Sequence, residues 1–582
     1  MRRGWFANLA CRRMVTIALV LASGCASSEE GPEPPLPLGT HVDDWRDEVV
    51  YQVMVDRFDD VESNEGDARV VPGDLSRFQG GDWEGVRRRL DYVQALGATA
   101  IWISPVVENA ETDPFAARED AYHGYWGRDF TRPNPHYGTE RDLARLVAEC
   151  HDRGLLVIVD VVLNHVGPLF YYDADGDHTL GAGEAEPPFS TVARTDVVWL
   201  DQPELRLGPP IFRLDGPPTI FDDLASFHRR GTTGDFDRQE EVELGDFPTG
   251  LRDLDTENER VRRALVETYT DWILRFDLDG FRIDTVPHVS VETWRALATA
   301  IRARLAETAK RRFLLLGEVF TGDDARAARY TREGALDANL WFGLKFGVID
   351  AVLLEGQPTV RFGEVLAARD AAYDGSAPHP DGIELSPRDA LVAFADNHDV
   401  PRVLGDLPDE RVLRLALVMV FALDAIPAVY YGTEQGFAGG FGHAARAPMF
   451  GAFDEGHPLF RFIARLAALR AARSALRFAP PVVRFESTIS GLESGPGAGM
   501  LAWERGESED RVLVVMNAHA FDQGETRDED GQAMRTGFPP GTELVDLLAP
   551  PGETARRYVA AVDGELVVRL GPREVVMLGV VP

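Results

Sequence analysis

The chain has the sequence GFRIDTVPH at Gly280–His288. A short, mostly apolar run that ends in a charged residue is typical of a buried parallel strand. Alternation along such a strand places the side chains of Arg282 and Asp284 on the same face. In barrels of parallel strands the active site lies at the carboxyl ends of the strands. The stretch therefore predicts a barrel strand that ends in a carboxylate at the active-site face.

Two further stretches of the chain show the same pattern. Glu318 follows an apolar run in LLLGEVF (Leu314–Phe320), and Asp399 ends the sequence FADNHD (Phe394–Asp399). A single acid at a strand end is most often the partner of a structural salt bridge. Three of them, each close to Arg, His or Asn, are hard to explain by structure alone, and they are the candidate catalytic residues.

The apolar runs predict the rest of the fold. Helical patterns separate most of them, such as the one that Thr139 can cap with Asp142 three residues later. Eight alternating units of this kind predict an α/β fold, a (β/α)8 TIM barrel. The predicted strands are Val49–Val55, Thr99–Ser104, Leu155–Leu163, Asp279–Ile283, Phe313–Gly317, Leu336–Trp341, Ala390–Ala395 and Ala428–Tyr431.

Two regions do not fit the barrel pattern. Residues 166–252 are too long for a loop after the third strand, because loops beyond ~15 residues are usually functional or form domains. They predict an inserted subdomain over the barrel mouth. Residues 476–582 contain short strands separated by turns, which predict a C-terminal all-β sandwich domain. The barrel is expected to comprise residues 42–165 and 253–475.

The N-terminus is typical of an export signal. Residues 1–24 combine a basic region with a short apolar stretch, and small residues precede Cys25. This order is similar to a lipoprotein signal of bacteria, in which Cys25 is lipidated; plain signal cleavage nearby is the alternative. Residues 25–41 are rich in Pro, Glu and Ser and predict a disordered tether. We expect an exported protein, anchored as a membrane lipoprotein of the cell envelope or secreted.

Charge and cysteine content exclude several classes of partner. The formal net charge of −35 argues against binding to nucleic acid or to an anionic membrane surface. It is compatible with a neutral sugar polymer and with bound cations. No segment has the ~20 apolar residues that span a bilayer, so membrane contact is expected only through a lipid anchor. Cys150 lies on an apolar helix face and has no partner for a disulfide. We expect a monomer.

The three acids suit the cleavage of a glycosidic bond with retention. That reaction needs two carboxyl groups ~5 Å apart, one that attacks the anomeric carbon and one that protonates the leaving oxygen. Glu318 follows four apolar residues, which suits a carboxyl group that must keep its proton. Arg282 can hold Asp284 ionised. Asp399, beside His398, can grip sugar hydroxyls in the transition state.

Several motifs together resemble the α-amylase superfamily, glycoside hydrolase family thirteen, and most of all a bacterial secreted α-amylase. They are DVVLNHVG (Asp160–Gly167), GFRIDTVPH, GEVF, FADNHD, LRDLD (Leu251–Asp255) and AYHGYWGRDF (Ala121–Phe130). The resemblance implies that Asp284 is the nucleophile, Glu318 the general acid/base and Asp399 the transition-state stabiliser. It also implies that substrate is bound by Arg282, His165, His398, Tyr125, Trp126 and His123.

The resemblance also implies a structural calcium ion between barrel and insert. Its ligands would be Asn164, Asp255 and the backbone carbonyl of His288, since oxygen ligands suit Ca²⁺. Carboxylates at alternate positions, Asp173, Asp175 and Asp177, are a candidate second metal site; a solvated acidic turn is the alternative interpretation.

The expected function is hydrolysis of internal α-1,4 bonds of starch or maltodextrin. Other functions on the same fold are the alternatives to this expectation. An α-glucanotransferase or a cyclomaltodextrinase-like relative would share the same three acids. A non-catalytic carbohydrate-binding protein would generally have lost them. Pro287 stands where many α-amylases have a Lys that helps hold sugar beyond the cleavage point, so the sequence leaves leaving-group binding and product length open. Arg252 stands where the family usually has Pro.

Overall fold

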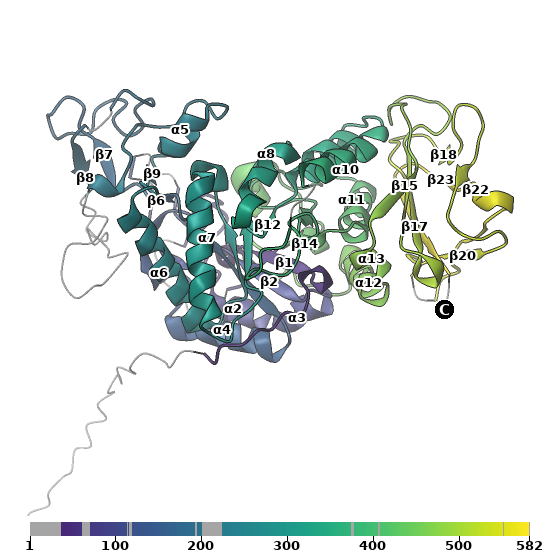
Figure 1. The fold of residues 1–582 in the computed structure, drawn as a ribbon, viewed down its shortest axis with the longest axis horizontal. Coiled ribbons are helices and arrows are strands. Elements are labelled where there is room, and N and C mark those ends of the chain that lie inside the picture. The colour runs from purple at the N-terminus through teal and green to yellow at the C-terminus, as the bar shows by residue number, and fades with distance from the viewer. Residues whose placement is uncertain are drawn as a thin grey trace, which may run out of the picture. The chain divides into compact units, whose positions relative to one another are not determined.

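A computed structural model gives the fold of the protein (Figure 1). It describes residues 36–580 except 61–69, 113, 116–118, 193–194, 201–223, 374–376, 406–407 and 551. The predicted signal peptide, residues 1–24, and the predicted lipidation site Cys25 lie outside the described residues. Within the described residues no helix is both long and apolar enough to cross a membrane.

Eight parallel strands form the centre of the fold, which confirms the predicted barrel. They pair in the order β12-β11-β10-β5-β2-β1-β14-β13. A parallel bridge between Leu340 and Val392 links the two ends of this order and closes the barrel. The strands are β1 (Val50–Val53), β2 (Ala100–Ile103), β5 (Leu156–Val161), β10 (Gly280–Ile283), β11 (Leu314–Gly317), β12 (Ala338–Asn339), β13 (Val392–Phe394) and β14 (Ile426–Tyr430).

Alternation along these strands divides the apolar residues between two cores. Trp102, Ile158 and Leu316 belong to a cluster inside the barrel. Their neighbours Ile103, Val159 and Leu315 belong to a separate, larger cluster that includes the surrounding helices. Because both faces of each strand are buried, the strands are apolar throughout, and an inward-facing charge is an exception.

Helices follow the strands around the outside of the barrel. The capping box predicted at Thr139 and Asp142 is present at the start of α4. Cys150 near the end of α4 is buried, as expected for a packing thiol. The longer helices are α4 (Glu140–Asp152), α6 (Glu259–Phe276), α7 (Val291–Ala306), α10 (Val360–Ala372), α11 (Glu410–Ala422) and α12 (Pro458–Ala472); the shorter are α1 (Val55–Phe58), α2 (Trp83–Arg88), α3 (Leu90–Ala95), α5 (Gln239–Leu244), α8 (Asp324–Ala328), α9 (Phe342–Leu344) and α13 (Ala475–Phe478).

The long connection after β5 forms small sheets beside the barrel. Arg252 holds this region together, because its fully buried guanidinium lies 2.7 Å from Asp246 and donates to the Phe170 carbonyl. A proline at this position could not supply those donors. Its paired strands are β6 (His165–Val166) with β9 (Arg252–Asp253), and β7 (Phe170–Tyr172) with β8 (Val197–Trp199). Another small sheet, β3 (Val107–Asn109) with β4 (Gly127–Pro133), belongs to the connection between β2 and β5.

The C-terminal part is all-β, as predicted. A six-stranded antiparallel sheet has the order β15-β16-β17-β24-β20-β21, and two two-stranded sheets accompany it. Met500, Val515 and Leu578 of the large sheet share one apolar core with Leu566 and Leu570 of the small sheets. The strands are β15 (Pro481–Phe485), β16 (Met500–Arg505), β17 (Val512–Asn517), β18 (Gly524–Glu525), β19 (Met534–Arg535), β20 (Glu543–Asp546), β21 (Arg557–Val559), β22 (Glu565–Leu566), β23 (Arg569–Leu570) and β24 (Glu574–Gly579).

The segment before β1 contacts the barrel from residue 36 onward. The Leu36 amide donates to the Arg275 carbonyl, and the Gly39 amide donates to the Asp277 carboxylate. The sequence predicted disorder up to residue 41, because composition alone does not show that the barrel offers acceptors to residues 36–41. We call this segment, residues 36–44, the N-terminal arm.

Candidate active site

The three predicted catalytic carboxylates line one cavity of about 690 Å³. Asp284 directly follows β10 and Glu318 directly follows β11; these strands are neighbours, with Ile283 paired to Gly317. Adjacent strands lie about 4.8 Å apart, so the two carboxyl groups enter the cavity side by side. Asp399 follows β13 and enters it from another part of the barrel. The expected convergence at the carboxyl ends of the strands is present.

Arg282 lies beneath these acids, fully buried inside the barrel. Its Nη1 is 2.9 Å from an Asp284 oxygen, and its Nη2 is 2.6 Å from a Glu318 oxygen. The same Nη2 is 3.8 Å from Asp399. The alternation of side chains that predicted an Arg282–Asp284 contact is therefore observed, and a single cation contacts all three acids.

A fourth acid, Asp160, completes this buried cluster, and the sequence did not single it out. Asp160 is paired with Arg282 in the register of β5 and β10, and its carboxylate lies 2.9 Å from Arg282 Nη1. It also accepts hydrogen bonds from Trp102 and from Tyr125. Asp160 is the first residue of the DVVLNHVG motif, but the motif alone does not show that it faces Arg282. That follows only from the register between β5 and β10.

The two neighbouring carboxyl groups, Glu318 and Asp284, have different pKa values. Burial raises the pKa of Glu318 to about 8, with the negative charges of Asp284 and Asp399 adding to it and Arg282 opposing. Burial raises the pKa of Asp284 to about 6, again against Arg282. At neutral pH Glu318 therefore holds a proton while Asp284 is ionised. This is the division of states that an acid and a nucleophile require.

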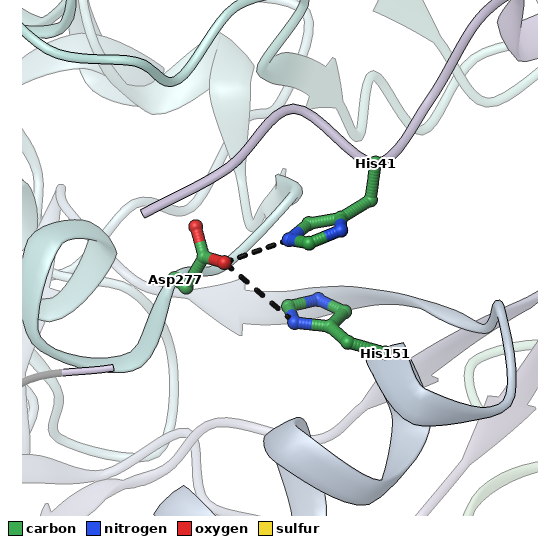
Figure 2. Close-up of side chains that lie close together, drawn as sticks. All are labelled: His41, His151 and Asp277. Atoms are coloured by element: carbon green, nitrogen blue, oxygen red, sulfur yellow. Dashed lines mark hydrogen bonds and ion pairs between the residues drawn. The ribbon is translucent and has the colours of Figure 1, made fainter. Parts of the chain in front are cut away.

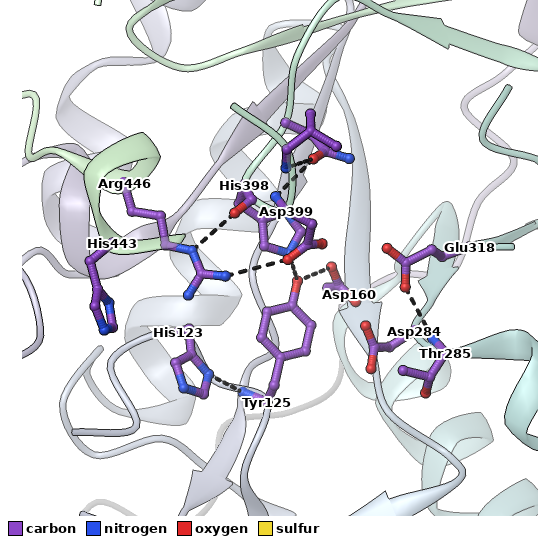
Figure 3. Close-up of polar contacts among 12 residues, drawn as sticks. His123, Tyr125, Asp160, Asp284, Thr285, Glu318, His398, Asp399, His443 and Arg446 are labelled. Carbon is purple, nitrogen blue, oxygen red and sulfur yellow. Dashed lines mark hydrogen bonds and ion pairs between the residues drawn. The ribbon is translucent and has the colours of Figure 1, made fainter. Parts of the chain in front are cut away.

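Asp399 is held in its ionised form by two cationic or hydrogen-bonding neighbours (Figure 3). Burial opposes ionisation, but His398, 3.0 Å away, and Arg446, 3.3 Å away, lower the pKa of Asp399 below its usual range. Arg446 also donates to the His398 carbonyl. Arg446 is the last residue of a short 3-10 helix, Gly442–Arg446, after β14, and the sequence did not predict its place in the site.

The predicted substrate-binding residues surround the acids. Tyr125 stacks on His398 with ring centroids 5.3 Å apart, and its hydroxyl lies 2.7 Å from His398 Nε2. His165 contacts the Tyr125 carbonyl, and burial lowers the pKa of His165 to about 3, so its ring is neutral. Figure 3 shows His123 beside Tyr125. His123, Tyr125, Trp126, His165 and His398 all line the cavity, whereas Arg282 lies below it.

Aromatic side chains form the outer part of the cavity. Phe320 is 50% exposed, Phe236 48% and Phe441 74%. Phe320 directly continues the strand end that carries Glu318, and it packs on Phe342. Exposed rings beside buried carboxylates provide flat apolar surfaces on which sugar rings can stack.

The residues of the predicted calcium site lie where the insert joins the barrel. The Leu254 amide donates to the Asn164 carbonyl, which brings the neighbourhood of Asp255 to Asn164. The Asn164 side chain is buried; its oxygen contacts His165 and the Thr285 hydroxyl, and its Nδ2 has no hydrogen-bond partner among the described residues. Since the two ends of an amide can be exchanged by a flip, the unpartnered end of Asn164 can present an oxygen, which suits a cation ligand. The His288 ring itself lines the cavity.

Asp255 has a second set of neighbours. His228 Nε2 lies 3.5 Å from Asp255 and 3.1 Å from Glu257, while its Nδ1 contacts Asp253. Burial would lower the pKa of His228, but these three carboxylates raise it to about 12. No sequence pattern indicated this histidine, which lies in the insert.

The residues that cluster at the candidate second metal site are not all the predicted ones. Asp173 and Asp175 lie together with Glu184, with carboxylate oxygens within 4.8 Å of one another. Asp177 instead accepts hydrogen bonds from the amide and hydroxyl of Thr179. The predicted alternation from Asp173 to Asp177 missed Glu184 because the loop folds back on itself, with the Ala174 amide donating to Glu184.

Two carboxyl groups side by side at the carboxyl ends of adjacent barrel strands are the arrangement that a retaining glycoside hydrolase requires. The family model described as "Alpha amylase, catalytic domain" matches residues 52–545. The chain belongs to the α-amylase family.

Individual relatives agree with this assignment. An α-amylase of Streptomyces lividans is 31% identical over 512 residues, which cover 80% of this chain and 53% of that protein. A cyclomaltodextrin glucanotransferase of Geobacillus stearothermophilus is 30% identical, covering 81% of this chain and 59% of that protein. The chain thus spans little more than half the length of these two relatives. The crystal structure of an Anoxybacillus α-amylase matches with 26% identity and a TM-score of 0.71, covering 93% of this chain and 100% of that chain.

Proposed function

We propose that the protein hydrolyses internal α-1,4-glucosidic bonds of starch or maltodextrin with retention of configuration. The observation that carries this proposal is the pairing of Asp284 and Glu318 on neighbouring strands, in contact with one arginine and with different protonation at neutral pH. The relatives that are α-amylases support the substrate class.

In the proposed reaction Asp284 attacks the anomeric carbon while Glu318 donates its proton to the leaving oxygen. A glycosyl–Asp284 ester forms and the glycosidic C–O bond breaks. Glu318, now ionised, takes a proton from water, which attacks the same carbon and releases Asp284. Asp399 is held ionised by Arg446 and His398 and would bind sugar hydroxyls as charge develops on the ring.

Arg282 has a positioning role in this proposal. It is shared between Asp160, Asp284 and Glu318, so that one positive charge faces three buried carboxyl groups. Complete ionisation would leave an uncompensated buried charge, which is costly. Retention of one proton by Glu318 relieves that cost and supplies the acid.

Transfer to a sugar acceptor is the second candidate activity. The specific observation in its favour is Phe320, a half-exposed residue of the cavity lining, where it offers an apolar surface to a bound sugar acceptor. Relatives named cyclomaltodextrin glucanotransferase are consistent with it.

One product analysis tests both activities. Soluble starch and short maltooligosaccharides are digested, and the first products are followed by NMR and by chromatography. We expect α-anomeric maltooligosaccharides, with transfer products minor and confined to high substrate. An initial β-anomer would overturn retention and the role of Asp284. If transfer products or cyclic products dominate, the protein is a glucanotransferase and the assignment as a hydrolase is wrong.

The calcium ion and the N-terminal anchor are also proposals. Asn164, Asp255 and the His288 carbonyl would hold Ca²⁺, whose contribution is to tie the insert to the barrel. Cys25 would carry the lipid that retains the exported enzyme at a membrane. The unpartnered Asn164 amide supports the first; the basic region and short apolar stretch before Cys25 support the second.

A further inference from the structure

Two histidines and one aspartate meet at the end of the barrel opposite the cavity (Figure 2). Asp277 precedes β10, whose far end carries Asp284. His151 lies in the last turn of α4, before β5, and His41 lies in the N-terminal arm. Three distant parts of the chain therefore contribute one side chain each to this group.

The donor atoms of the three side chains face one another. His41 Nε2 lies 2.7 Å from Asp277 Oδ2, and His151 Nδ1 lies 3.7 Å from the same oxygen. One donor atom from each residue lies within 4.8 Å of the other two. Figure 2 shows both imidazoles with a nitrogen turned toward the carboxylate.

The surrounding contacts fix which atoms are available. His151 Nε2 forms a hydrogen bond with Asp279 at 2.9 Å, so the other ring nitrogen of His151, Nδ1, is the one that faces Asp277. Asp277 Oδ1 accepts from Lys310 and from the Gly39 amide, which leaves Oδ2 for the histidines. Histidines that bind metals usually donate their other N–H to a carboxylate or carbonyl, and binding carboxylates are themselves hydrogen-bonded. The His151–Asp279 and Asp277–Lys310 pairs have this arrangement.

We propose that His41, His151 and Asp277 bind a divalent transition cation of the zinc class. Two imidazole nitrogens and one carboxylate oxygen suit Zn²⁺ or Co²⁺ and not Ca²⁺, with water as the fourth ligand. The two rings stack with centroids 3.8 Å apart and an interplanar angle of 22°. Binding therefore requires one ring to turn, and His41 is the more exposed of the two, with its side chain 32% exposed against 11% for His151.

The ion would fasten the N-terminal arm to the barrel. The arm is also held by the Leu36 and Gly39 amides, by Thr40, whose hydroxyl donates to the Ala309 carbonyl, and by Val42, which is buried in the barrel core. An ion that joins His41 to His151 and Asp277 links the arm to α4 and to the end of α6. The site lies away from the catalytic cavity, so its role is in stability.

Zinc titration of the enzyme tests the proposal. The protein is stripped with a chelator, saturated with Ca²⁺ to fill oxygen sites, and titrated with Zn²⁺ by calorimetry; Co²⁺ is added separately to record its visible absorption. His41→Gln is the test variant, and His457→Asn, which alters a partly exposed histidine outside the group, is the matched control. We expect one strongly bound equivalent of Zn²⁺, a higher Tm and a tetrahedral Co²⁺ spectrum in the wild type and the control.

The His41→Gln variant should lose that equivalent, the Tm increase and the Co²⁺ spectrum while keeping its activity on starch. Equal zinc binding in wild type and His41→Gln, or none in the wild type, would overturn the proposal. Zinc-soaked crystals of the wild type give a check that needs no variant. An anomalous peak beside Asp277 Oδ2 supports the site, and peaks confined to other places contradict it.

Discussion

Arg282 and Glu318 form the shortest contact within the catalytic cluster, 2.6 Å between Nη2 and Oε1, although Glu318 is the carboxyl group that must carry a proton. The two statements are compatible because Arg282 also contacts Asp160 and Asp284. Its single charge is divided, and burial then outweighs the remaining attraction at Glu318. Arg282 thus orients the Glu318 carboxyl group without making it lose its proton.

Replacing the nucleophile should abolish catalysis. Asp284→Asn removes the attacking oxygen anion, and we expect kcat on starch to fall by several orders of magnitude because the covalent route is lost. Circular dichroism and Tm should remain close to those of the wild type, since the amide preserves the shape of the side chain. Retention of a tenth of the wild-type activity would show that Asp284 is not the nucleophile.

The pH dependence of kcat/KM should be bell-shaped. Asp284 must be ionised, so activity should fall as pH drops through about 6; Glu318 must be protonated, so activity should fall as pH rises through about 8. These limbs belong to the coupled pair as a whole. Rates measured across pH 4 to 10 at low substrate check this; a profile that is flat from pH 7 to 10 would contradict the acid role of Glu318.

Arg446 should contribute to transition-state binding through Asp399. Arg446→Ala removes a charge-assisted contact, which is worth about 1.5–3 kcal/mol, so kcat/KM should drop roughly 10–100-fold. Arg569→Ala, which alters an arginine 81% exposed in the C-terminal domain, is the matched control and should leave kcat/KM unchanged. If the two variants behave alike, Arg446 has no part in catalysis.

Removal of calcium should lower stability. An ion that binds only the folded protein adds about 2.7 kcal/mol at a free concentration one hundred times its Kd. Exhaustive chelation should therefore lower Tm, and Ca²⁺ should restore it. Asn164→Ala should abolish that restoration. An unchanged Tm after chelation, with no metal detected in the protein, would refute the calcium site.

The N-terminal anchor can be tested by fractionation. Cys25→Ser removes the acceptor of the lipid, and we expect the enzyme to move from the membrane fraction to the soluble fraction, or to remain unprocessed. Mass spectrometry of the wild-type N-terminus should show an acylated Cys25. A soluble wild-type protein with an unmodified N-terminus would exclude lipidation and leave the catalytic assignment intact.

Local patterns were sufficient to predict the barrel and its three acids. The eight strands are apolar on both faces and short, and Arg282 and Asp284 are two residues apart, so their contact follows from alternation alone. Asp160, by contrast, depends on the register between β5 and β10. Arg446 depends on how a loop after β14 folds back over Asp399.

The group around Asp277 was also beyond local prediction. His41 and Asp277 are 236 residues apart, and no pattern near His41 indicates a partner. The N-terminal composition predicted disorder because it describes the free chain; the barrel supplies the acceptors that order residues 36–41.

The docking of the N-terminal arm has a consequence for the order of folding. Thr40 bonds to Ala309, 269 positions later, and the Trp45 indole donates to the Arg312 carbonyl. These two partners of residues 40–45 therefore do not exist until residues up to 312 have been synthesised. At roughly 5–20 residues per second that delay lasts tens of seconds or less. Throughout that delay the arm lacks these two contacts, and it can complete its docking on the barrel only once more than half of the chain has been made.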